Sequence, residues 1–596
     1  MELRLFRLRW RRRFRKGHKQ VESINTQTSE NLDKHLVKKF GNLMPVRRFV
    51  FGWLALMLIL IGGLIAQNLA LSNYYQTLRT VPGGIYNEGV LGTFTTANPI
   101  YATSDADLTV SRLVFASLFQ YDATGKLAPE LASSYSVNAH GNEYVVHLKP
   151  NLTWQDGKPL TSSDVVFTYH KIQDPDAKSP LQNDWQGINV SAPDPLTVVF
   201  HLPDALASFP YNLTNGIVPE HLLASVSAPD LRSSDFNTLH PVGSGPFSWQ
   251  AIQVSGNGDP LKSQARVALV PFTNYALGKP KLQKFVVEVF ADSNQLSQAF
   301  ADGSLTAAEG ITTPVAKLIS KASVAQHNLI YRAANMVFFK TSSGILSDKA
   351  VRSDLVQAAN VPKIISSLSY STRAVREPLL EGQLAYDPAF VQPGFDLNAA
   401  RNSLTADGWI PGKGFIRYKG NQQLGFALTA ANNPESHKVA SQLQQQWKAL
   451  GVNVFVRYLD PADYQTALSY HDYDAILNGI SIGVDPDVYV YWDSSQADIR
   501  SPNRLNFSEW KNAQADVSLE SGRTRLNPTL RALKYKPFLQ AWQQDAPALG
   551  LYQPRLLYLT NGYVNGLIDH PLVTATDRLA GVQNWEIKQN KVTNQT

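Results

Sequence analysis

The sequence predicts an α/β protein with mixed sheets and helices packed on them, carried by one transmembrane helix. Three observations lead to this fold class. Residues 433–480 alternate helix and strand patterns, residues 143–173 hold a strand, a turn and a capped helix, and residues 49–71 contain no ionisable group. Helices that alternate with strands pack on the faces of a sheet. A chain of 596 residues is also long enough to bury several cores.

Composition agrees with a globular protein. Apolar residues make up 44% of the chain, and the 37 Gly and 34 Pro are ordinary numbers for this length. The chain has no cysteine, which excludes disulfides, thiolate metal sites and a lipid-modified cysteine as a membrane anchor. An outside-facing domain of this size therefore depends on its apolar cores for stability.

The net charge of +7 comes from the N-terminal segment. Residues 1–48 hold 14 Lys and Arg against four acids, whereas the 525 residues after the uncharged run carry a net charge of −3. The basic run at residues 4–16 interleaves Arg with Leu, Phe and Trp, a pattern that also occurs in nucleic-acid-binding arms. Beside a membrane span, attraction to anionic lipid explains the same charge, and we expect no nucleic-acid partner.

Residues 49–71 predict a transmembrane helix. At 1.5 Å per residue the run spans about 34 Å, enough to cross a bilayer. Arg47 and Arg48 precede it and Arg79 is the first charge after it, so the positive-inside rule places residues 1–48 in the cytoplasm. The alternative is a signal peptide, but its apolar core is normally about 7–15 residues long. We therefore expect an uncleaved, single-pass anchor in the cell membrane, with the C-terminal domain outside the cytoplasm.

The segment 144–173 predicts a strand, a turn and a helix in succession. Alternating apolar residues in "YVVHL" indicate a half-buried strand. Asp156-Gly157 favours the turn, Thr161 and Asp164 resemble a capping box, and Asp174-Pro175 ends the helix. The polar residues of this segment thus have structural roles, apart from His170, which we interpret as a surface histidine rather than a base.

Further elements follow the same logic. Asn433 and Pro434 start a helix that Gly451 ends, and alternation at 452–458 predicts the strand after it. A second helix and strand follow, with the sequences "DPADYQTALSY" and "YDAILNGI". Shorter helices are expected at 348–360 and 396–408.

The motifs of catalysis are largely missing from the sequence. It contains no HExxH, GxxxxGK[ST] or GxSxG motif, and its 12 histidines are scattered. The Gly-Ser-Gly of residues 243–245 lacks the spacing of a nucleophile elbow and indicates a turn into a strand. The pairs Asp485/Asp487 and Asp472/Asp474 have the residue type for acid–base chemistry, but turns explain them as well. We expect no enzymatic activity, no metal and no cofactor.

Seven segments together resemble the family 5 extracellular solute-binding proteins, the peptide- and nickel-type receptors of ABC importers. They occur in the order found in that family: "YNEGVLGTFTTANPI" (86–100), "RLVFASLFQYDATGKLAPELASSYSV" (112–137), "YVVHLKPNLTWQDGKPLTSSDVVFTY" (144–169), "HPVGSGPFSW" (240–249), "VRSDLVQAANVPKI" (351–364), "AARNSLTADGW" (399–409) and "DPDVYVYWDSSQ" (485–496). The resemblance covers nearly all of residues 84–596.

The resemblance implies a two-lobed periplasmic-binding-protein fold of type II, a clamp with an inserted third subdomain. Its parts would be a linker at 72–83, lobe I at 84–119 with 239–325 and 556–596, the inserted subdomain at 120–238, and lobe II at 326–555. The block around Asp156 would then be scaffold in the inserted subdomain.

The resemblance also implies where a ligand binds. In lobe I it points to Thr103, Ser104 and Asp105, whose segment lines the cleft in the family. In lobe II it points to the strand that pairs with a bound peptide's main chain: Asn478, Gly479, Ile480, Ser481 and Ile482. Peptide-binding members have an aspartate where this chain has Ile482, so we expect Asp485 to read a ligand ammonium, or the ligand to lack a free amine. Trp492, like Tyr489 and Tyr491, either lines the cleft or belongs to the core.

The resemblance implies a protein that captures an oligopeptide or other small peptide-like solute outside the cytoplasm and delivers it to the permease subunits of an ABC importer. The membrane-spanning anchor departs from the family, whose members are mostly periplasmic or lipid-tethered. A second hypothesis is a membrane-anchored peptide sensor or chaperone on the same clamp, in which residues 1–48 contact a specific partner. A surface hydrolase is a third, and it needs a nucleophile or metal that the sequence does not supply.

Overall fold

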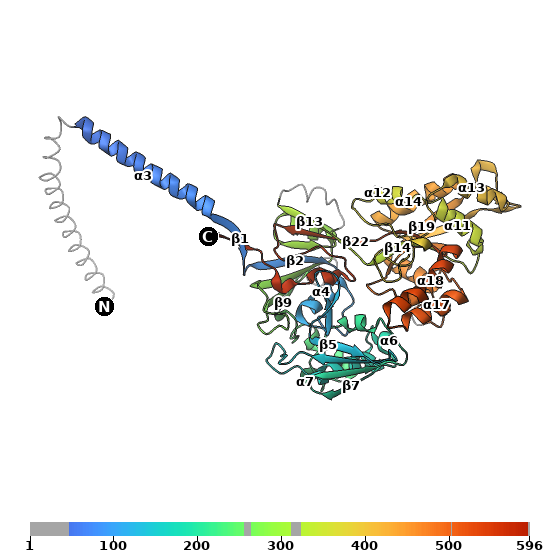
Figure 1. The fold of residues 1–596 in the computed structure, drawn as a ribbon, viewed down its shortest axis with the longest axis horizontal. Helices are drawn as coiled ribbons and strands as arrows, with labels where there is room; N and C mark the ends of the chain where they lie inside the picture. The colour runs from blue at the N-terminus through green and yellow to red at the C-terminus, as the bar shows by residue number, and fades with distance from the viewer. Residues whose placement is uncertain (1–46, 256–263, 312–322, 502–503, 594–596) are drawn as a thin grey trace, which may run out of the picture. The chain divides into compact units, whose positions relative to one another are not determined.

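The computed structural model describes residues 47–255, 264–311, 323–501 and 504–593 (Figure 1). The chain divides into two compact units, residues 1–79 with 589–596 and residues 80–588. Most of the basic segment, residues 1–46, lies outside the described part. Several residues of the predicted lobe I, at 256–263, 312–322 and 594–596, lie outside it too.

The described part of the first unit contains one long helix, α3 (Arg47–Tyr75). Its stretch from Arg48 to Asn68 has a mean hydropathy of 2.5, and among the described helices it is the one long and apolar enough to cross a membrane. The predicted linker at 72–83 is different in the structure: α3 continues to Tyr75, and β1 (Gln76–Val81) pairs with β23 (Lys588–Thr593). The two paired strands are more than 500 residues apart in sequence, so no local pattern reveals them.

The second unit begins with a seven-stranded sheet, in the order β13-β22-β12-β2-β11-β10-β9. Strand β2 runs parallel to β11 and β12, while β22 lies antiparallel between β12 and β13. The strands are β2 (Ile85–Leu91), β9 (Phe247–Ser255), β10 (Gln264–Pro271), β11 (Lys284–Phe290), β12 (Ala307–Glu309), β13 (Val324–Ile330) and β22 (Arg555–Asn561). The C-terminal part of the chain thus returns to the sheet that the N-terminal part began.

Helices α4 (Asp105–Val114) and α9 (Ser293–Ala301) pack on this sheet. A fully buried ion pair joins the C-terminal η11 (Ala575–Leu579) to the sheet, because Arg578 Nη2 lies 2.6 Å from Glu88 Oε1 and both side chains are inaccessible to solvent. Gly243 and Gly245 pack against the end of α4, where a Cβ at Gly243 would lie 1.9 Å from the Val114 carbonyl oxygen. The two glycines of the Gly-Ser-Gly motif therefore let the main chain approach the end of α4 closely, just before β9 begins.

The middle of the chain adds a four-stranded sheet in the order β5-β6-β8-β7. Its strands are β5 (Ala132–Val137), β6 (Glu143–Leu148), β7 (Asn189–Asp194) and β8 (Thr197–His201). Helix α5 (Ser162–Gln173) starts with the predicted capping box of Thr161 and Asp164. The predicted strand, turn and capped helix are confirmed. The smaller elements here are β3 (Phe119–Tyr121), β4 (Leu127–Pro129), η3 (Pro175–Ala177), α6 (Gln182–Trp185), η4 (Phe209–Thr214), α7 (Glu220–Leu223), α8 (Ala228–Leu231) and η5 (Asp235–Asn237).

A five-stranded mixed sheet forms the other large part, in the order β19-β18-β20-β14-β21. Its strands are β14 (Ala333–Phe339), β18 (Gly425–Ala431), β19 (Asn453–Leu459), β20 (Ala475–Ser481) and β21 (Ala548–Tyr552). Asn433 and Gly451 cap α14 (Pro434–Leu450) as predicted, with Gly451 in the left-handed region at φ 99°. The alternation of helix and strand at 433–480 and the mixed sheet are confirmed.

Helices pack against this sheet in two clusters, α11 to α14 with one core and α15 to α18 with another. Both shorter predicted helices are present, as α11 and α13. The bounds are α11 (Lys349–Gln357), α12 (Val361–Ser367), α13 (Leu397–Ala406), α15 (Pro461–Tyr470), α16 (Tyr489–Trp492), α17 (Ala513–Arg523) and α18 (Pro528–Asp545). Short elements complete the described chain: η7 (Ile345–Ser347), η8 (Pro388–Phe390), β15 (Ile410–Pro411), η9 (Lys413–Phe415), β16 (Arg417–Lys419), β17 (Gln422–Gln423), η10 (Ser494–Ala497) and η12 (Val582–Asn584).

Two adjacent segments connect the large sheets. The chain passes from β13 to β14 through Tyr331 and Arg332, and returns from β21 to β22 through Gln553 and Pro554. The Tyr331 amide donates to the Pro554 carbonyl at 2.9 Å, and Gln553 Nε2 donates to the Tyr331 carbonyl at 3.0 Å. We call these four residues the connecting ribbon. The lobe boundaries predicted from the sequence stay a prediction, because sheet membership alone does not fix where a folding unit ends.

Candidate ligand-binding site

Strand β20 has one edge that is only partly paired. Along its whole length it pairs with β14, from Ala475 opposite Phe339 to Ser481 opposite Ala333. On the other edge, β18 pairs only with residues 475–477. Residues 478–481 therefore have no ladder partner on this side among the described strands. An edge of this kind can accept an extended peptide as an additional strand.

The side chains of this segment alternate between the core and the surface. Ile480 and Ile482 are buried in the core between the sheet and α15 to α18, while Gly479 and Ser481 are exposed. A Cβ at Gly479 would lie 2.8 Å from the Asn335 side-chain oxygen, so the position is suited to glycine. The two isoleucines hold the strand in place, and the predicted contact of this segment with a ligand would be made by its main chain.

Asn478 is the remaining member of the predicted lobe II segment. Its side chain accepts a hydrogen bond from the Tyr464 hydroxyl at 3.1 Å, and the same hydroxyl donates to the Leu477 carbonyl at 2.7 Å. Tyr464 on helix α15 thus donates to the Leu477 carbonyl at the point where the pairing of β20 with β18 ends.

The predicted lobe I residues lie at the start of α4. Ser104 caps the helix by accepting from the Asp107 amide at 3.1 Å, while Thr103 and Asp105 are exposed. This helix end lies near the carboxyl end of β12, because the charge of Asp105 acts on Glu309, the last residue of that strand. Ligands of α/β proteins bind at the carboxyl ends of parallel strands, which agrees with the predicted role of this segment.

Sequence reasoning did not identify Glu309. Its side chain is 3% exposed and its Oε2 has no hydrogen-bond partner. Burial raises the pKa of the Glu309 carboxyl to about 7, although the positive charge of Arg578 offsets part of the rise and the charge of Asp105 adds to it. A buried carboxylate oxygen without a hydrogen-bond partner is uncommon in a pure scaffold, but nothing in the sequence around residue 309 distinguishes it.

Asp485 is engaged by an arginine. Arg531 on α18 makes two hydrogen bonds of 2.5 Å to its two carboxylate oxygens. The Asp485 side chain is 12% exposed and the Arg531 side chain is 6% exposed. Burial raises the pKa of Asp485, and the guanidinium offsets part of that rise. A ligand ammonium would have to displace Arg531, so this geometry disfavours the expected role of Asp485 as an ammonium reader.

Trp492 is fully buried in the same core as Ile480, with its ring 5.8 Å from that of Trp542. The side chain therefore packs in the core and is not exposed to a ligand in this conformation. Tyr489 and Tyr491 are only partly buried. The sequence left open whether Trp492 lines the cleft or belongs to the core, and the structure places its side chain in the core.

We call the part of the chain from β3 to η5, residues 119–237, the middle segment. A cavity of about 730 Å³ lies between the middle segment and the part that carries β20. One wall comes from β5, β6 and η4 and includes Tyr135, Tyr144 and Tyr211. The opposite wall includes Asp485 and Arg531. Its volume is in the range of small-molecule sites, and its lining combines aromatic and aliphatic side chains with the charged groups of Lys126, Asp485 and Arg531.

Direct contacts join the two sides next to this cavity. Ser208 Oγ donates to Asp487 Oδ2 at 3.0 Å, and the Ala207 amide donates to the Arg523 carbonyl at 2.9 Å. Arg523 also pairs with Asp487, at 3.3 Å. The middle segment and the part of the chain that carries Asp487 and Arg523 therefore meet through one hydrogen-bonded cluster in this conformation.

Comparison with known proteins decides the family. Residues 126–501 match the model for the middle region of the bacterial extracellular solute-binding proteins, family 5. The match spans more than half of the chain. The chain belongs to this family. The fold class and the resemblance predicted from the sequence are confirmed.

Relatives of this family 5 protein extend over most of its length. The oligopeptide-binding protein AppA of Bacillus subtilis is 25% identical over 514 residues, which is 79% of this chain and 86% of that protein. The probable D,D-dipeptide-binding periplasmic protein DdpA of Escherichia coli is 24% identical over 495 residues, covering 80% and 90%.

Solved structures share the fold. The ABC transporter substrate binding protein CtaP of Listeria monocytogenes is 25% identical, with a TM-score of 0.73 over 85% of this chain and 99% of that chain. AppA of B. subtilis in complex with a nonapeptide is 23% identical, with a TM-score of 0.68 over 86% and 100%. NikZ of Campylobacter jejuni in complex with Ni(L-His) is also 23% identical, with a TM-score of 0.70 over 84% and 99%.

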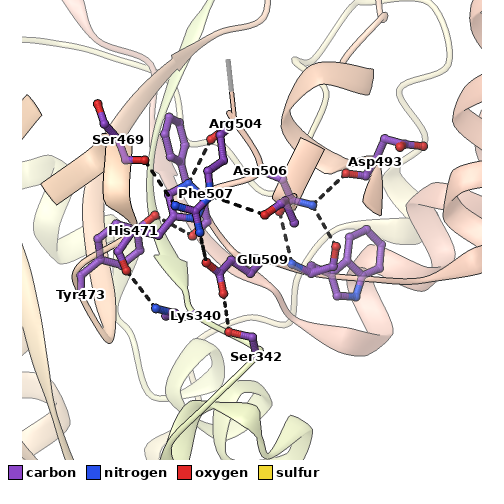
Figure 2. A network of polar contacts seen from close by, with 12 residues as sticks. Lys340, Ser342, Ser469, His471, Tyr473, Asp493, Arg504, Asn506, Phe507 and Glu509 are labelled. Carbon is purple, nitrogen blue, oxygen red and sulfur yellow. Dashed lines mark hydrogen bonds and ion pairs between the residues drawn. The ribbon is translucent and has the colours of Figure 1, made fainter. Parts of the chain in front are cut away.

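One polar network of this solute-binding protein brings together the residue types of a hydrolase triad (Figure 2). The Ser342 hydroxyl donates to Glu509 Oε2. His471 Nδ1 lies 3.0 Å from the other carboxylate oxygen, Glu509 Oε1. The carboxylate thus lies between the hydroxyl and the imidazole, and His471 is fully buried. In a hydrolase triad the histidine contacts the nucleophile directly, so the order of groups in this network differs from that of a triad. The absence of enzymatic activity stays a prediction.

The same network anchors a loop of lobe II. His471 Nε2 lies 3.0 Å from the Arg504 carbonyl, and Arg504 in turn pairs with Glu509 at 2.9 Å. In the part of the chain that the structure describes, no group of three or more His, Asp or Glu residues could hold a metal ion. His170 is exposed on α5, as expected.

The network predicts a defined loss of stability in acid. Contacts with His471 and Ser342 hold the pKa of Glu509 at about 2, below its usual value of 4.5. A lowered pKa stabilises the fold above pH 4.5, and the contribution, up to about 3 kcal/mol, is lost as the pH falls from 4.5 to 2. Melting temperatures measured between pH 7 and 2.5 should fall more steeply for the wild type than for Glu509→Gln. The exposed carboxylate of Glu520 is the control, and a Glu509→Gln profile parallel to that of Glu520→Gln would contradict the assignment.

Proposed function

We propose that this family 5 protein captures a peptide-like solute and delivers it to the permease subunits of an ABC importer. The observation that carries the proposal is the unpaired edge of β20 at residues 478–481. Main-chain pairing along this edge would give affinity without a specific sequence, and neighbouring pockets would set the preference for side chains. The relatives AppA, an oligopeptide-binding protein, and DdpA, a probable D,D-dipeptide-binding protein, support a peptide class.

Ligand-driven closure would occur about the connecting ribbon. Two short segments that lie side by side can absorb the backbone changes of a hinge. A ligand that contacts both Thr103–Asp105 and residues 478–482 binds better when these segments approach each other, so it favours the closed arrangement. The permease would then recognise the closed form.

The protein would be held at the cell membrane by α3. The length and hydropathy of the segment Arg48–Asn68 support a single span, and they also fit a signal sequence. The 14 basic residues at 1–48 support a cytoplasmic N-terminus near anionic lipid. Residues 80–588 would then lie outside the cytoplasm, where the permease presents its receiving surface.

Backbone pairing predicts a periodic pattern of ligand sensitivity. Thermal unfolding of the full-length protein with peptides of two to eight residues identifies a stabilising peptide, since a ligand at 100 times its Kd adds about 2.7 kcal/mol. N-methylation of each amide of that peptide should then weaken binding at alternate positions, by about three- to tenfold for each hydrogen bond lost. Alanine substitution of the corresponding side chains is the control. Equal tolerance of N-methylation at all positions would contradict strand addition.

The role of the N-terminal segment separates transport from sensing. If the chain serves transport, replacement of residues 1–46 by an unrelated basic leader should leave uptake of the stabilising peptide unchanged, because only charge and topology are needed. If the clamp is instead a sensor or chaperone, the segment contacts a specific partner, and uptake or signalling should be lost while peptide binding persists. Uptake in cells and binding to the purified protein are measured on the same variant.

A further inference from the structure

Arg332 lies where three parts of the second unit meet. It belongs to the connecting ribbon, between β13 and β14. Its amide donates to the Leu572 carbonyl at 2.6 Å, and its carbonyl accepts from the amides of Ile482 and Gly483 at 3.0 and 2.9 Å. Its Nη2 is 3.5 Å from the position that a Cβ would take at Gly125, on the turn before β4. The main chain thus fixes this residue at the end of β20, and its side chain extends toward the middle segment.

The guanidinium of Arg332 has no acidic partner among the described residues. Its Nε is buried without an acceptor, and no ion pair of this side chain occurs in the described part of the chain. Five other arginines, by contrast, have carboxylate or carbonyl partners. Arg112, Arg531 and Arg578 each pair with a carboxylate, and Arg352 and Arg417 each donate to several oxygens. An arginine taken partly out of water without such partners is costly.

The surroundings of Arg332 are aromatic and positively charged. Burial lowers the pKa of Arg332, and the like-charged Arg373 lowers it further, whereas the neighbouring phenols of Tyr121 and Tyr211 offset part of this decrease. Arginine nevertheless stays protonated in proteins. Tyr211 lines the 730 Å³ cavity, and so does Lys126, the residue after Gly125. Arg332 therefore lies next to the cavity, on a side that holds a second cation.

The carboxylates on the opposite wall are already neutralised. Asp485 is bound by both nitrogens of the Arg531 fork, and Asp487 pairs with Arg523 and accepts from Ser208. Position 482, where a free aspartate was expected for peptide-binding relatives, is a buried isoleucine. The charge left without a partner beside the cavity is therefore positive.

We propose that Arg332 binds a carboxylate of the ligand, such as the C-terminal carboxylate of a peptide, and that a free ligand ammonium is not required. The planar guanidinium offers two parallel N–H donors that match a carboxylate. This proposal rests on the proposed function, because it requires that one ligand occupies both the cavity and the β20 edge. Because Arg332 is bonded to Leu572, Ile482 and Gly483, an anion bound there would also favour the arrangement in which these parts meet.

The test uses the full-length protein in detergent micelles and five defined probes. Four are forms of the pentapeptide Ala-Phe-Ala-Phe-Ala, with the N-terminus free or acetylated and the C-terminus free or amidated. The fifth is N-benzoylglycine, an aromatic carboxylate that is not a peptide of two or more residues.

Affinities are measured by calorimetry for the wild type, Arg332→Gln, Arg332→Lys and Arg373→Gln. The exposed Arg373 is the matched control, since its removal takes away one nearby positive charge. The melting temperature of each unliganded variant checks folding, and the main-chain bonds of residue 332 remain in every variant.

The proposal predicts that amidation weakens wild-type binding about ten- to hundredfold, whereas acetylation changes it less than about threefold. Arg332→Gln should abolish the preference for a free carboxylate, Arg332→Lys should restore part of it, and Arg373→Gln should keep it. Equal binding of free and amidated forms, or a preference that survives Arg332→Gln, would overturn the inference and leave the peptide function intact. Arg332-dependent binding of N-benzoylglycine alone would support the inference for a carboxylate ligand that is not this peptide. Failure of every probe to bind would overturn the inference, and only the absence of stabilisation by every peptide of two to eight residues would overturn the proposed peptide function.

Discussion

The main chain crosses between the seven-stranded and five-stranded sheets in two neighbouring segments, residues 331–332 and 553–554, which are hydrogen-bonded to each other. On one side β13 pairs with β22, and on the other β14 pairs with β21, so the ribbon continues the strand pairing of both sheets. Both sheets are therefore held in register at their connection. A pair of short adjacent segments also leaves few dihedral angles through which the lobes can move, which favours a defined hinge over free rotation.

The ribbon also positions the candidate binding residues. Strand β14 leaves the ribbon and pairs with β20 over seven residues, which places residues 478–482 next to the connection. The two amides after β20 donate to the Arg332 carbonyl. The buried Ile480 and Ile482 fix the strand on its core side, so its main chain is preorganised on the other. Binding energy is then not spent on ordering the receiving strand.

Local signals in the sequence identified much of the fold. Thr161 with Asp164, and Asn433 with Gly451, specify helix ends through neighbouring residues, and these features are present in the structure. The pairing of β1 with β23 had no such signal, because the two strands are more than 500 residues apart. The site was predicted by family resemblance, and its chemistry depends on contacts that only the folded chain reveals. Asp485 looked available in the sequence, but Arg531, 46 residues later, occupies both of its oxygens. Arg332 and Glu309 are notable for the partners they lack, which no sequence pattern encodes.

Ligand binding is proposed to add a strand to the free edge of β20. Hydrogen exchange of the backbone amides at 478–481, followed by mass spectrometry or NMR with and without a stabilising peptide, tests this pairing. Amides on the unpaired edge should exchange slowly only when the peptide is bound, while those paired with β14 should be protected in both states. Unchanged exchange across 478–481 at saturating peptide would contradict strand addition and place the ligand elsewhere on the protein.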